Sequence, residues 1–188
     1  MAKKMKCYVT SIGEPTTDIC VWSLKRNGFD VELLQDNSSL QSKLKTIFNS
    51  ATSDFLRVDA DIIVNKNFTV EFLKSLDYMN DIWWWQFKCF DWYKLDIAHC
   101  MSYIREPAIE HLRNNIDKFK DSLRPETDVS RIQELHNPRR LLTYEDAIVG
   151  LHGYGINDIE PVKALKEARN QSHLYDFEMV EKLERLKK

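Results

Sequence analysis

The chain has 188 residues, of which 43% are hydrophobic and 30% are charged, and its formal net charge is −2. This is the composition of an ordinary globular protein, and the length predicts one domain with a sizeable core. The balanced charge shows no general basic excess, which argues against a nucleic-acid partner. No apolar run reaches the length of a membrane span, so we expect no membrane-spanning helix.

The cysteines indicate the compartment. There are four, and none of them forms a C-x-x-C pair. They are Cys7, Cys20, Cys89 and Cys100. Reduced core cysteines are the favoured interpretation, and a zinc site is disfavoured. The basic residues 1–6 are not followed by the apolar core of a signal peptide. We therefore expect a cytoplasmic protein, in a host cytoplasm if the source is viral.

The first third of the chain alternates between strand and helix patterns. We expect strands over residues 6–10, 29–34 and 55–58, a helix from Thr16 or Thr17 to Asn27-Gly28, and a helix capped by Ser38 or Ser39. This order predicts a parallel sheet covered by helices. Ligands of such sheets bind at the carboxyl ends of the strands. The polar residues at these predicted ends are Thr10, Ser11, Asp36, Asp59 and Asp61.

The second half is more mixed. We expect a helix over residues 69–79, an aromatic strand over 82–93, a helix from Pro107 to about Phe119, a strand within 140–151, and a terminal helix over 161–188. Residues 83–85 are three consecutive tryptophans. Because side chains alternate along a strand, at least one of them, Trp84 or the pair Trp83 and Trp85, should be exposed or lie in a groove.

Asp59 and Asp61 are the most informative pair in the chain. They follow an apolar strand and are two residues apart, so their side chains share one face. Two like charges at a buried strand end are costly unless a cation compensates them, and a hard divalent ion takes oxygen ligands. The alternative is a solvated loop. Arg57 shares this face and should either pair with a carboxylate or contact a phosphate.

The order of elements, from Tyr8-Val9-Thr10-Ser11 to Leu151-His152-Gly153-Tyr154, resembles the GT-A fold of nucleotide-sugar glycosyltransferases. Residues 55–61, Phe-Leu-Arg-Val-Asp-Ala-Asp, look like the metal-binding D-x-D of that family. His152-Gly153 is similar to its carboxyl-side metal histidine. Residues 98–105 resemble the segment that closes over the substrates, although they lack the usual glycines. The compact chain is similar to the glycosyltransferase domains of large algal viruses.

The resemblance implies a single-domain α/β protein whose mixed, mainly parallel sheet is flanked by helices. A nucleotide-binding half would cover about 1–65, an acceptor-side half about 66–160, and a C-terminal helix about 161–188. The implied activity is metal-dependent transfer of a hexosyl or deoxyhexosyl unit from a nucleoside-diphosphate sugar, UDP-linked by expectation, to a glycan or other hydroxyl acceptor. Mn²⁺, or Mg²⁺ in its place, suits the ligands Asp59, Asp61 and His152.

The donor would be held by residues at the strand ends. Thr10 and Ser11 would frame the base and the ribose, Asp36 would accept a hydrogen bond from a uracil imide, and Asp59 would contact the ribose or metal-bound water. Each has a structural alternative, namely loop chemistry for Thr10 and Ser11 and an Asx-turn or helix cap for Asp36. Lys43 could also pair with a carboxylate or reach a phosphate, but a solvated helix face is the favoured interpretation.

The catalytic base has two candidates. An inverting transfer needs a carboxylate that takes the proton of the acceptor hydroxyl, and Asp128 and Asp146 are the candidates. Asp128 fits the family layout better, because Asp146 lies six residues before His152. A retaining transfer needs no such base, and helix capping is the structural alternative for both carboxylates.

Two other functions compete with this interpretation. One is a non-catalytic module that binds nucleotide sugars or glycans. The other is a nucleotidyltransferase, which usually carries a Gly-rich phosphate loop with Lys or Arg after its first strand. Residues 11–16, Ser-Ile-Gly-Glu-Pro-Thr, have no such loop. The sequence leaves the donor sugar, the acceptor, the stereochemistry and the oligomeric state open.

Overall fold

The computed structural model describes residues 4–91, 96–118, 129 and 141–153. Its described part is built around one sheet with the strand order β2-β1-β3-β6-β5-β7-β4. The strands are β1 (Lys6–Ser11), β2 (Asp30–Gln35), β3 (Phe55–Asp59), β4 (Ile62–Val64), β5 (Trp84–Asp91), β6 (Asp96–Ile104) and β7 (Leu141–His152). The helices are α1 (Thr17–Arg26), α2 (Leu40–Ser50), α3 (Val70–Ser75) and α4 (Glu106–Asn114), with 3-10 turns η1 (Leu76–Tyr78) and η2 (Ile116–Lys118).

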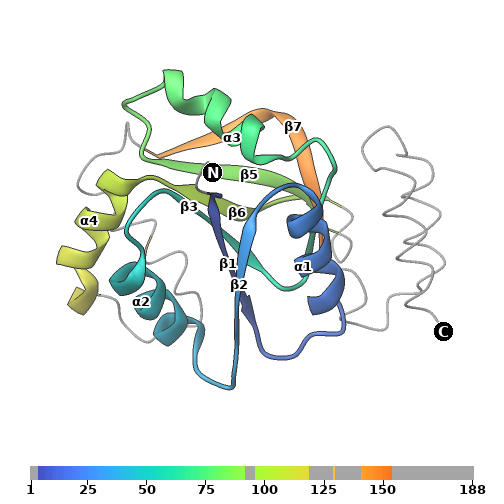
Figure 1. Ribbon diagram of the computed structural model, residues 1–188, viewed down its shortest axis with the longest axis horizontal. Coiled ribbons are helices and arrows are strands. Elements are labelled where there is room, and N and C mark those ends of the chain that lie inside the picture. Colours follow the sequence, from blue (N-terminus) through green and yellow to red (C-terminus); the bar gives the residue numbers. More distant parts are fainter. Residues whose placement is uncertain (1–3, 92–95, 119–128, 130–140, 154–188) are drawn as a thin grey trace, which may run out of the picture.

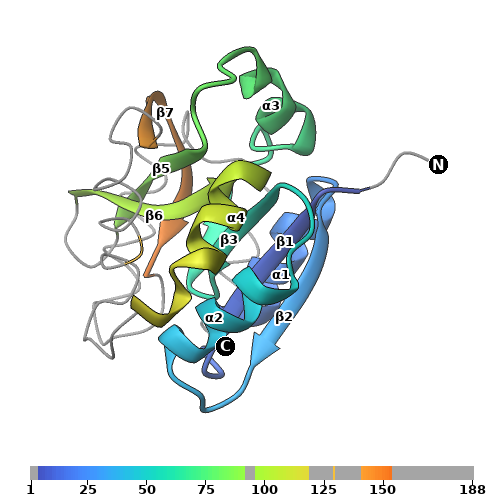
Figure 2. The ribbon, with the colours of Figure 1, turned by 90° about the vertical axis from the view of Figure 1, so that its left-hand side faces the viewer.

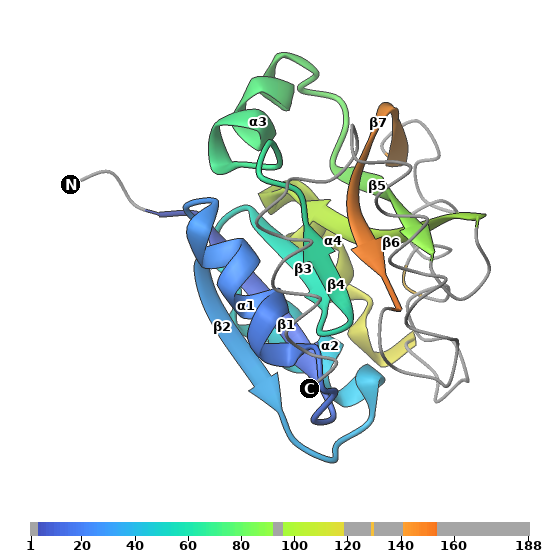
Figure 3. The same cartoon turned by 90° about the vertical axis from the view of Figure 1, so that its right-hand side faces the viewer.

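The sheet is mixed. Strand β1 pairs in parallel with β2 and β3, and β5 pairs in parallel with β7. Strand β6 runs antiparallel to β3 and β5, and β4 runs antiparallel to β7. Helices cover both faces, α2 and α4 on one (Figure 2) and α1 on the other (Figure 3). The expected α/β architecture, a mixed sheet flanked by helices, is confirmed.

Local sequence explains the helices that cover the sheet. Ser39 caps α2, because its hydroxyl accepts a hydrogen bond from the amide of Ser42 at 3.2 Å. The apolar stripe of α2 packs on the sheet through Leu44, Ile47 and Phe48, all of which are buried. Periodicity of this kind places a helix without any knowledge of its partners, because burial of one apolar face drives the packing.

The tryptophan run corrects one expectation. Trp84 belongs to the core between the sheet and α2 and α4, whereas Trp85 belongs to the core on the α1 and α3 side. Their exposed fractions are only 4% and 2%. Alternation along β5 holds, but both faces of the sheet are covered, so both faces are dry. The prediction that one of them lies exposed or in a groove was therefore wrong for Trp84 and Trp85, and Trp83 is half-buried.

Some elements differ in length from the sequence prediction. The helix expected over 69–79 is split into α3 and η1, with Thr69 as its cap. Strand β7 is 12 residues long. The predicted helix over 161–188 and Asp128 lie outside the described residues. Within the described ranges, no helix is long and apolar enough to cross a membrane.

Candidate functional site

Asp59 is anchored at the carboxyl end of β3. It lies opposite Thr10 of β1 in the parallel register, and the Thr10 hydroxyl donates to its Oδ1 at 2.8 Å. The Arg57 guanidinium forms an ion pair with the same oxygen. Arg57 is nearly buried, whereas a third of the Asp59 side chain is exposed. Of the two roles expected for Arg57, the structure shows the carboxylate pair, which holds Asp59 in one orientation.

Asp61 and His152 meet although they are far apart in sequence. Strand β4 starts directly after Asp61 and pairs with the end of β7, where Ile62 lies opposite His152. The amide of Gly153 donates to the carbonyl of Asp61 at 3.0 Å, which adds a backbone hydrogen bond just beyond the paired residues of β4 and β7. The Nε2 atom of His152 is 3.2 Å from Oδ2 of Asp61. The structure thus brings these two predicted metal ligands into direct contact.

Asp91 is a functional candidate that the sequence prediction missed. It ends β5 opposite His152, and its Oδ2 lies 3.2 Å from the imidazole Nδ1. Its side chain is almost completely buried. A carboxylate behind a histidine is common around metal sites. Here Asp91 acts on the ring through its charge, because Nδ1 has no hydrogen-bond partner among the described residues. Its position at a strand end was a usable signal, but only the pairing of β5 with β7 places it beside His152.

Charge accumulates around the His152 ring. Burial lowers the pKa of His152, but the hydrogen bonds and negative charges of Asp61 and Cys100 outweigh it and raise that pKa to about 11. The pKa of the neighbouring Cys100 thiol shifts in the opposite direction. A hydrogen bond with Cys89 and the proximity of His152 lower the pKa of Cys100 against the effect of burial. We therefore expect the ring to be an imidazolium between Asp61 and Asp91 when no cation is bound.

We expect His152 to remain protonated at about pH 8 in protein treated with a chelator. Because its folded pKa lies above the unfolded value near ~6.5, the stabilisation is complete below that value and is lost as the pH rises through about 11. NMR of the imidazole nitrogens measures the charge directly. His152→Gln should lower the melting temperature near neutral pH, and this difference should shrink in alkali. A neutral imidazole at about pH 8 would contradict the expectation.

The side chains of Asp61 and His152 supply part of the ligand set that a bound cation needs. Asp61 Oδ1 is buried and has no hydrogen-bond partner in the described part of the chain. Such an oxygen is costly to leave unpaired, and a bound cation would satisfy it. A carboxylate oxygen with an imidazole nitrogen is a donor set that suits Mn²⁺. Among the described residues, however, no three His, Cys, Asp or Glu side chains are arranged as a complete metal site.

A small cavity lies beside Asp59, at the carboxyl end of β1. Its volume is about 120 Å³. The residues that line it are Thr10, Ser11, Ile12, Glu14, Leu40, Lys43 and Asp59. The Ser11 hydroxyl shapes the loop above it, because it donates to Glu14 Oε2 at 2.6 Å and accepts from the amide of Gly13 at 2.9 Å. Gly13 has φ +97°, a value that favours glycine in this turn.

Lys43 corrects a second expectation. It is buried rather than solvated, with 3% of its surface exposed. Its ammonium donates to the carbonyls of Ser11 at 2.6 Å and Asp36 at 2.8 Å, and so links the ends of β1 and β2. The Asp36 carboxylate caps its own turn by accepting from the Ser38 amide at 2.8 Å, and Asp36 does not line the cavity. The contacts with Ser38, hydroxyl first and amide second, lower the pKa of Asp36.

Lys43→Met should reduce the free energy of unfolding by about 1–3 kcal/mol, because two carbonyl groups lose their donor. Urea denaturation measures this loss. Lys45→Met on the same helix is the matched control and should change stability by less than about 0.5 kcal/mol. Equal stability of the Lys43→Met and Lys45→Met proteins would contradict the structural role of Lys43.

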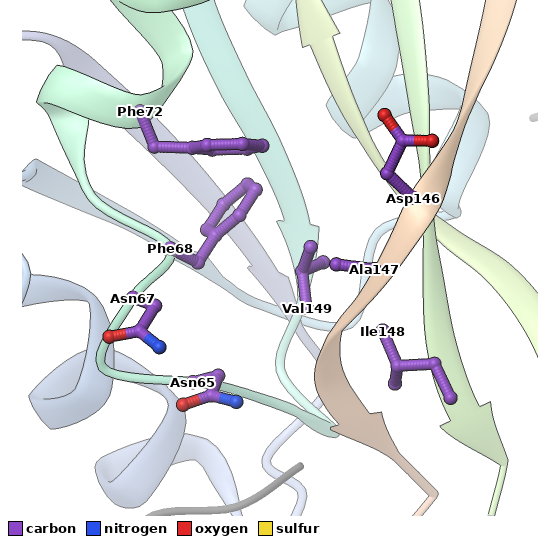
Figure 4. Close-up of a pocket in the computed structure, with 8 residues that line it drawn as sticks. All are labelled: Asn65, Asn67, Phe68, Phe72, Asp146, Ala147, Ile148 and Val149. Atoms are coloured by element: carbon purple, nitrogen blue, oxygen red, sulfur yellow. The ribbon is translucent and has the colours of Figure 1, made fainter. Parts of the chain in front are cut away.

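Of the two candidates for the catalytic base, only Asp146 is among the described residues. Asp128 lies outside the described residues. Asp146 is on β7, six residues before His152, which corresponds to roughly 15–20 Å along the strand. Its carboxylate lies at a different pocket, between β7 and the start of α3 (Figure 4). The structure therefore does not bring Asp146 together with Asp61 and His152.

Comparison with known proteins finds similar solved structures, but it finds no match by sequence. Neither a family model nor a curated protein matches the chain. A glycosyltransferase involved in the glycosylation of the major capsid of PBCV-1 is similar over 98% of this chain and 100% of its own, with TM-score 0.58 and 14% identity. Protein A197 from STIV is similar over 80% and 86%, with TM-score 0.58 and 10% identity.

The chain has a glycosyltransferase-like fold. This confirms the fold and the resemblance to a viral glycosyltransferase that the order of elements and residues 55–61 predict. A Bacillus anthracis protein assigned as a glucose-1-phosphate thymidylyltransferase is also similar, over 89% of this chain and 96% of its own, with TM-score 0.55 and 9% identity. The layout of this sheet is thus common to proteins of both transferase classes, and the residues of the site have to decide the chemistry.

Proposed function

We propose that the protein is a metal-dependent glycosyltransferase that moves a hexosyl or deoxyhexosyl unit from a UDP-sugar to a hydroxyl acceptor such as a glycan. The contact between Asp61 and His152, beside Asp59 at the carboxyl end of β3, carries the proposal. This contact, with the buried and unpaired Oδ1 of Asp61, favours a cation site over a solvated loop. The likeness to the PBCV-1 glycosyltransferase supports the proposal by analogy.

Asp61 and His152 would hold Mn²⁺ or Mg²⁺ together with oxygen atoms of the donor diphosphate. When bound, the ion neutralises the charge that develops on the leaving diphosphate. Asp61 can offer Oδ1, which has no partner in the described part of the chain. His152 has to lose a proton before Nε2 can ligate, and Asp91 keeps the ring in place. Asp59, held by Arg57, would contact the ribose or a metal-bound water.

The donor base would lie in the cavity of about 120 Å³ beside Thr10 and Lys43. This space suits the single ring of uracil better than the two rings of a purine. Asp36 would contribute through its carbonyl, which fixes Lys43. A direct contact between the Asp36 carboxylate and the nucleotide base stays a prediction, as does the role of Asp128 as the catalytic base. The position of Asp146 at a separate pocket counts against that role for Asp146.

Uridine diphosphate should therefore bind at least about tenfold more tightly than guanosine diphosphate, a difference of about 1.4 kcal/mol. Both compounds carry the same diphosphate, so the comparison isolates the base. Calorimetry in the presence of Mn²⁺ measures both affinities. A preference for the guanosine compound would reject the assignment of the base to this cavity.

Turnover tests the function itself. The protein would be incubated with UDP-sugars and Mn²⁺, and released UDP would be measured, with chelator as the control. The Bacillus anthracis neighbour makes a nucleotidyltransferase the second candidate. That reaction joins a nucleoside triphosphate to a sugar phosphate and releases pyrophosphate, so the two products distinguish the enzymes. Tight nucleotide-sugar binding without either product would indicate a non-catalytic binding module.

A further inference from the structure

A second pocket lies at the other end of the β4–β7 pair from Asp61 and His152. Its volume is about 270 Å³, near the lower limit for ligand sites in proteins. We name it the Asn67 pocket (Figure 4). The residues that line it are Asn65, Asn67, Phe68, Phe72, Asp146, Ala147, Ile148 and Val149. None of these residues lines the cavity of about 120 Å³ beside Asp59, and none belongs to the group formed by Asp61, Asp91 and His152.

We propose that the Asn67 pocket binds one neutral sugar ring of the glycan acceptor, away from the reacting centre. This inference rests on the proposed function for the identity of the ligand as an acceptor. The binding itself stands on the chemistry of the pocket and can be measured without nucleotide or metal.

The polar side chains of the pocket match a ring with several hydroxyl groups. The amides of Asn65 and Asn67 can each donate and accept, and the Asp146 carboxylate accepts. A hydroxyl group is both a donor and an acceptor, so it satisfies both kinds of partner. Among the described residues that line the pocket there is no Lys, Arg or His, which disfavours phosphate and other anions. An ammonium ligand is also disfavoured, because it has no acceptor for the N–H groups of the two asparagine side chains.

The apolar side of the pocket matches the C–H face of a sugar ring. Phe72 is half-buried and presents its ring to the pocket, whereas Phe68, with 2% of its surface exposed, packs behind it with the centroids 5.6 Å apart. Phe72 in turn meets Tyr144 edge-on at 5.1 Å, which fixes its ring against β7. A rigid aromatic wall beside a few placed polar groups is the usual composition of a site for an amphipathic small molecule.

The loop that carries both asparagines is fixed before any ligand arrives. The buried side chain of Asn27 donates to the carbonyls of Asn65 at 2.6 Å and Phe68 at 3.0 Å. The amide of Asn65 donates to the carbonyl of Val149 at 2.8 Å, which joins the loop to β7. Ordering such a loop only on binding would cost affinity, so this preorganisation favours a binding role.

Strand β7 is irregular at the residue that supplies the carboxylate. Phe87 pairs with Tyr144, and the next residue, Lys88, pairs with Ile148. Residues 145–147 therefore have no register partner on β5, although the Lys88 side chain forms an ion pair with Glu145, and Asp146 projects from this bulge. Bulges of this kind re-aim a side chain and are common next to functional sites. The regular strand would not present Asp146 to the pocket at the same angle.

The experiment titrates the full chain with a panel of neutral methyl glycosides and follows backbone amides by NMR, with chelator and without nucleotide. We expect at least one glycoside to bind in the millimolar range and to shift the amides of Asn65, Asn67 and Ala147. Asn67→Ala should weaken binding at least about tenfold, since the variant loses the two hydrogen bonds that we expect the Asn67 amide to form with the glycoside. Asp146→Asn should weaken it less than Asp146→Ala, because the amide still accepts.

Glu71→Ala, an exposed change on α3 outside the pocket, is the matched control and should leave the titration unchanged. Choline and inorganic phosphate are the competing probes. Failure of every glycoside to bind, equal binding by Asn67→Ala, or a preference for either competing probe would overturn the proposal. UDP release without glycoside binding would reject this pocket and leave the proposed function standing. Glycoside binding without UDP release would support the pocket and count against the enzyme.

Discussion

Asp61→Asn should abolish Mn²⁺-dependent nucleotide binding while the fold survives. The amide has nearly the same shape, but it carries no charge and only one of its two terminal atoms can ligate a cation. The change also removes the ion-pair partner of His152, the second proposed ligand. Loss of an outer partner of a metal ligand already costs about 10–100-fold in affinity, so loss of a ligand itself should exceed about a hundredfold.

Calorimetry with UDP, in Mn²⁺ and in chelator, separates the two contributions. The wild type should show a large difference between these conditions, and Asp61→Asn should bind equally weakly in both. A melting curve checks that the variant is folded. Asp81→Asn, which removes an exposed carboxylate from a loop, is the matched control and should keep the metal effect. Full Mn²⁺-dependent binding by folded Asp61→Asn would remove the basis of the metal site.

Phe87→Ala should lower the free energy of unfolding by about 3–5 kcal/mol. Phe87 is fully buried on β5, on the face of the sheet that α3 covers. Its ring meets Phe68 edge-on at 5.0 Å and lies 6.0 Å from Tyr144 of β7. Truncation leaves a cavity between three elements, and the rigid strands around it can collapse only partly.

Urea denaturation measures this loss, with an unchanged slope as the sign that the folded state is otherwise intact. Phe87→Leu keeps an apolar side chain in the same space and should cost much less than Phe87→Ala. Nucleotide binding by the folded fraction should stay close to wild type at low temperature, because Phe87 lines neither proposed site. A loss below about 1 kcal/mol would mean that α3 is not anchored through this ring.

Several features of the candidate site could be predicted from residues alone. Strand parity placed Arg57 and Asp59 on one face, and the pair between them follows from that parity. Asp61 lies in the turn between β3 and β4, so the predicted shared face does not extend to it. The apolar stripe of α2 and its Ser39 cap were also local signals. Such features depend on residues within one or two turns of each other, so the periodicity of the sequence contains them.

Lys43 and the tryptophans show where local patterns mislead. A lysine on a helix is usually solvated, yet two carbonyl groups at the ends of β1 and β2 need a donor, and Lys43 supplies it. Trp84 and Trp85 alternate as a strand requires, but alternation cannot tell whether the second face is wet or covered. That depends on α1 and α3, which come from other parts of the chain.

The sequence by itself did not predict β4 or β6 as strands, but it predicted the strands and helices of the first third of the chain and placed Asp59 and Asp61 at and just after the end of β3. Only the tertiary structure decided which side chains stand beside them, because strand pairing joins distant segments through backbone hydrogen bonds that no side-chain pattern specifies uniquely. The pairing of β7 with β4 brings His152 to Asp61, and its pairing with β5 brings Asp91 behind the ring. The same strand carries Asp146 away to the Asn67 pocket, because β-geometry separates two residues of one strand in proportion to their spacing.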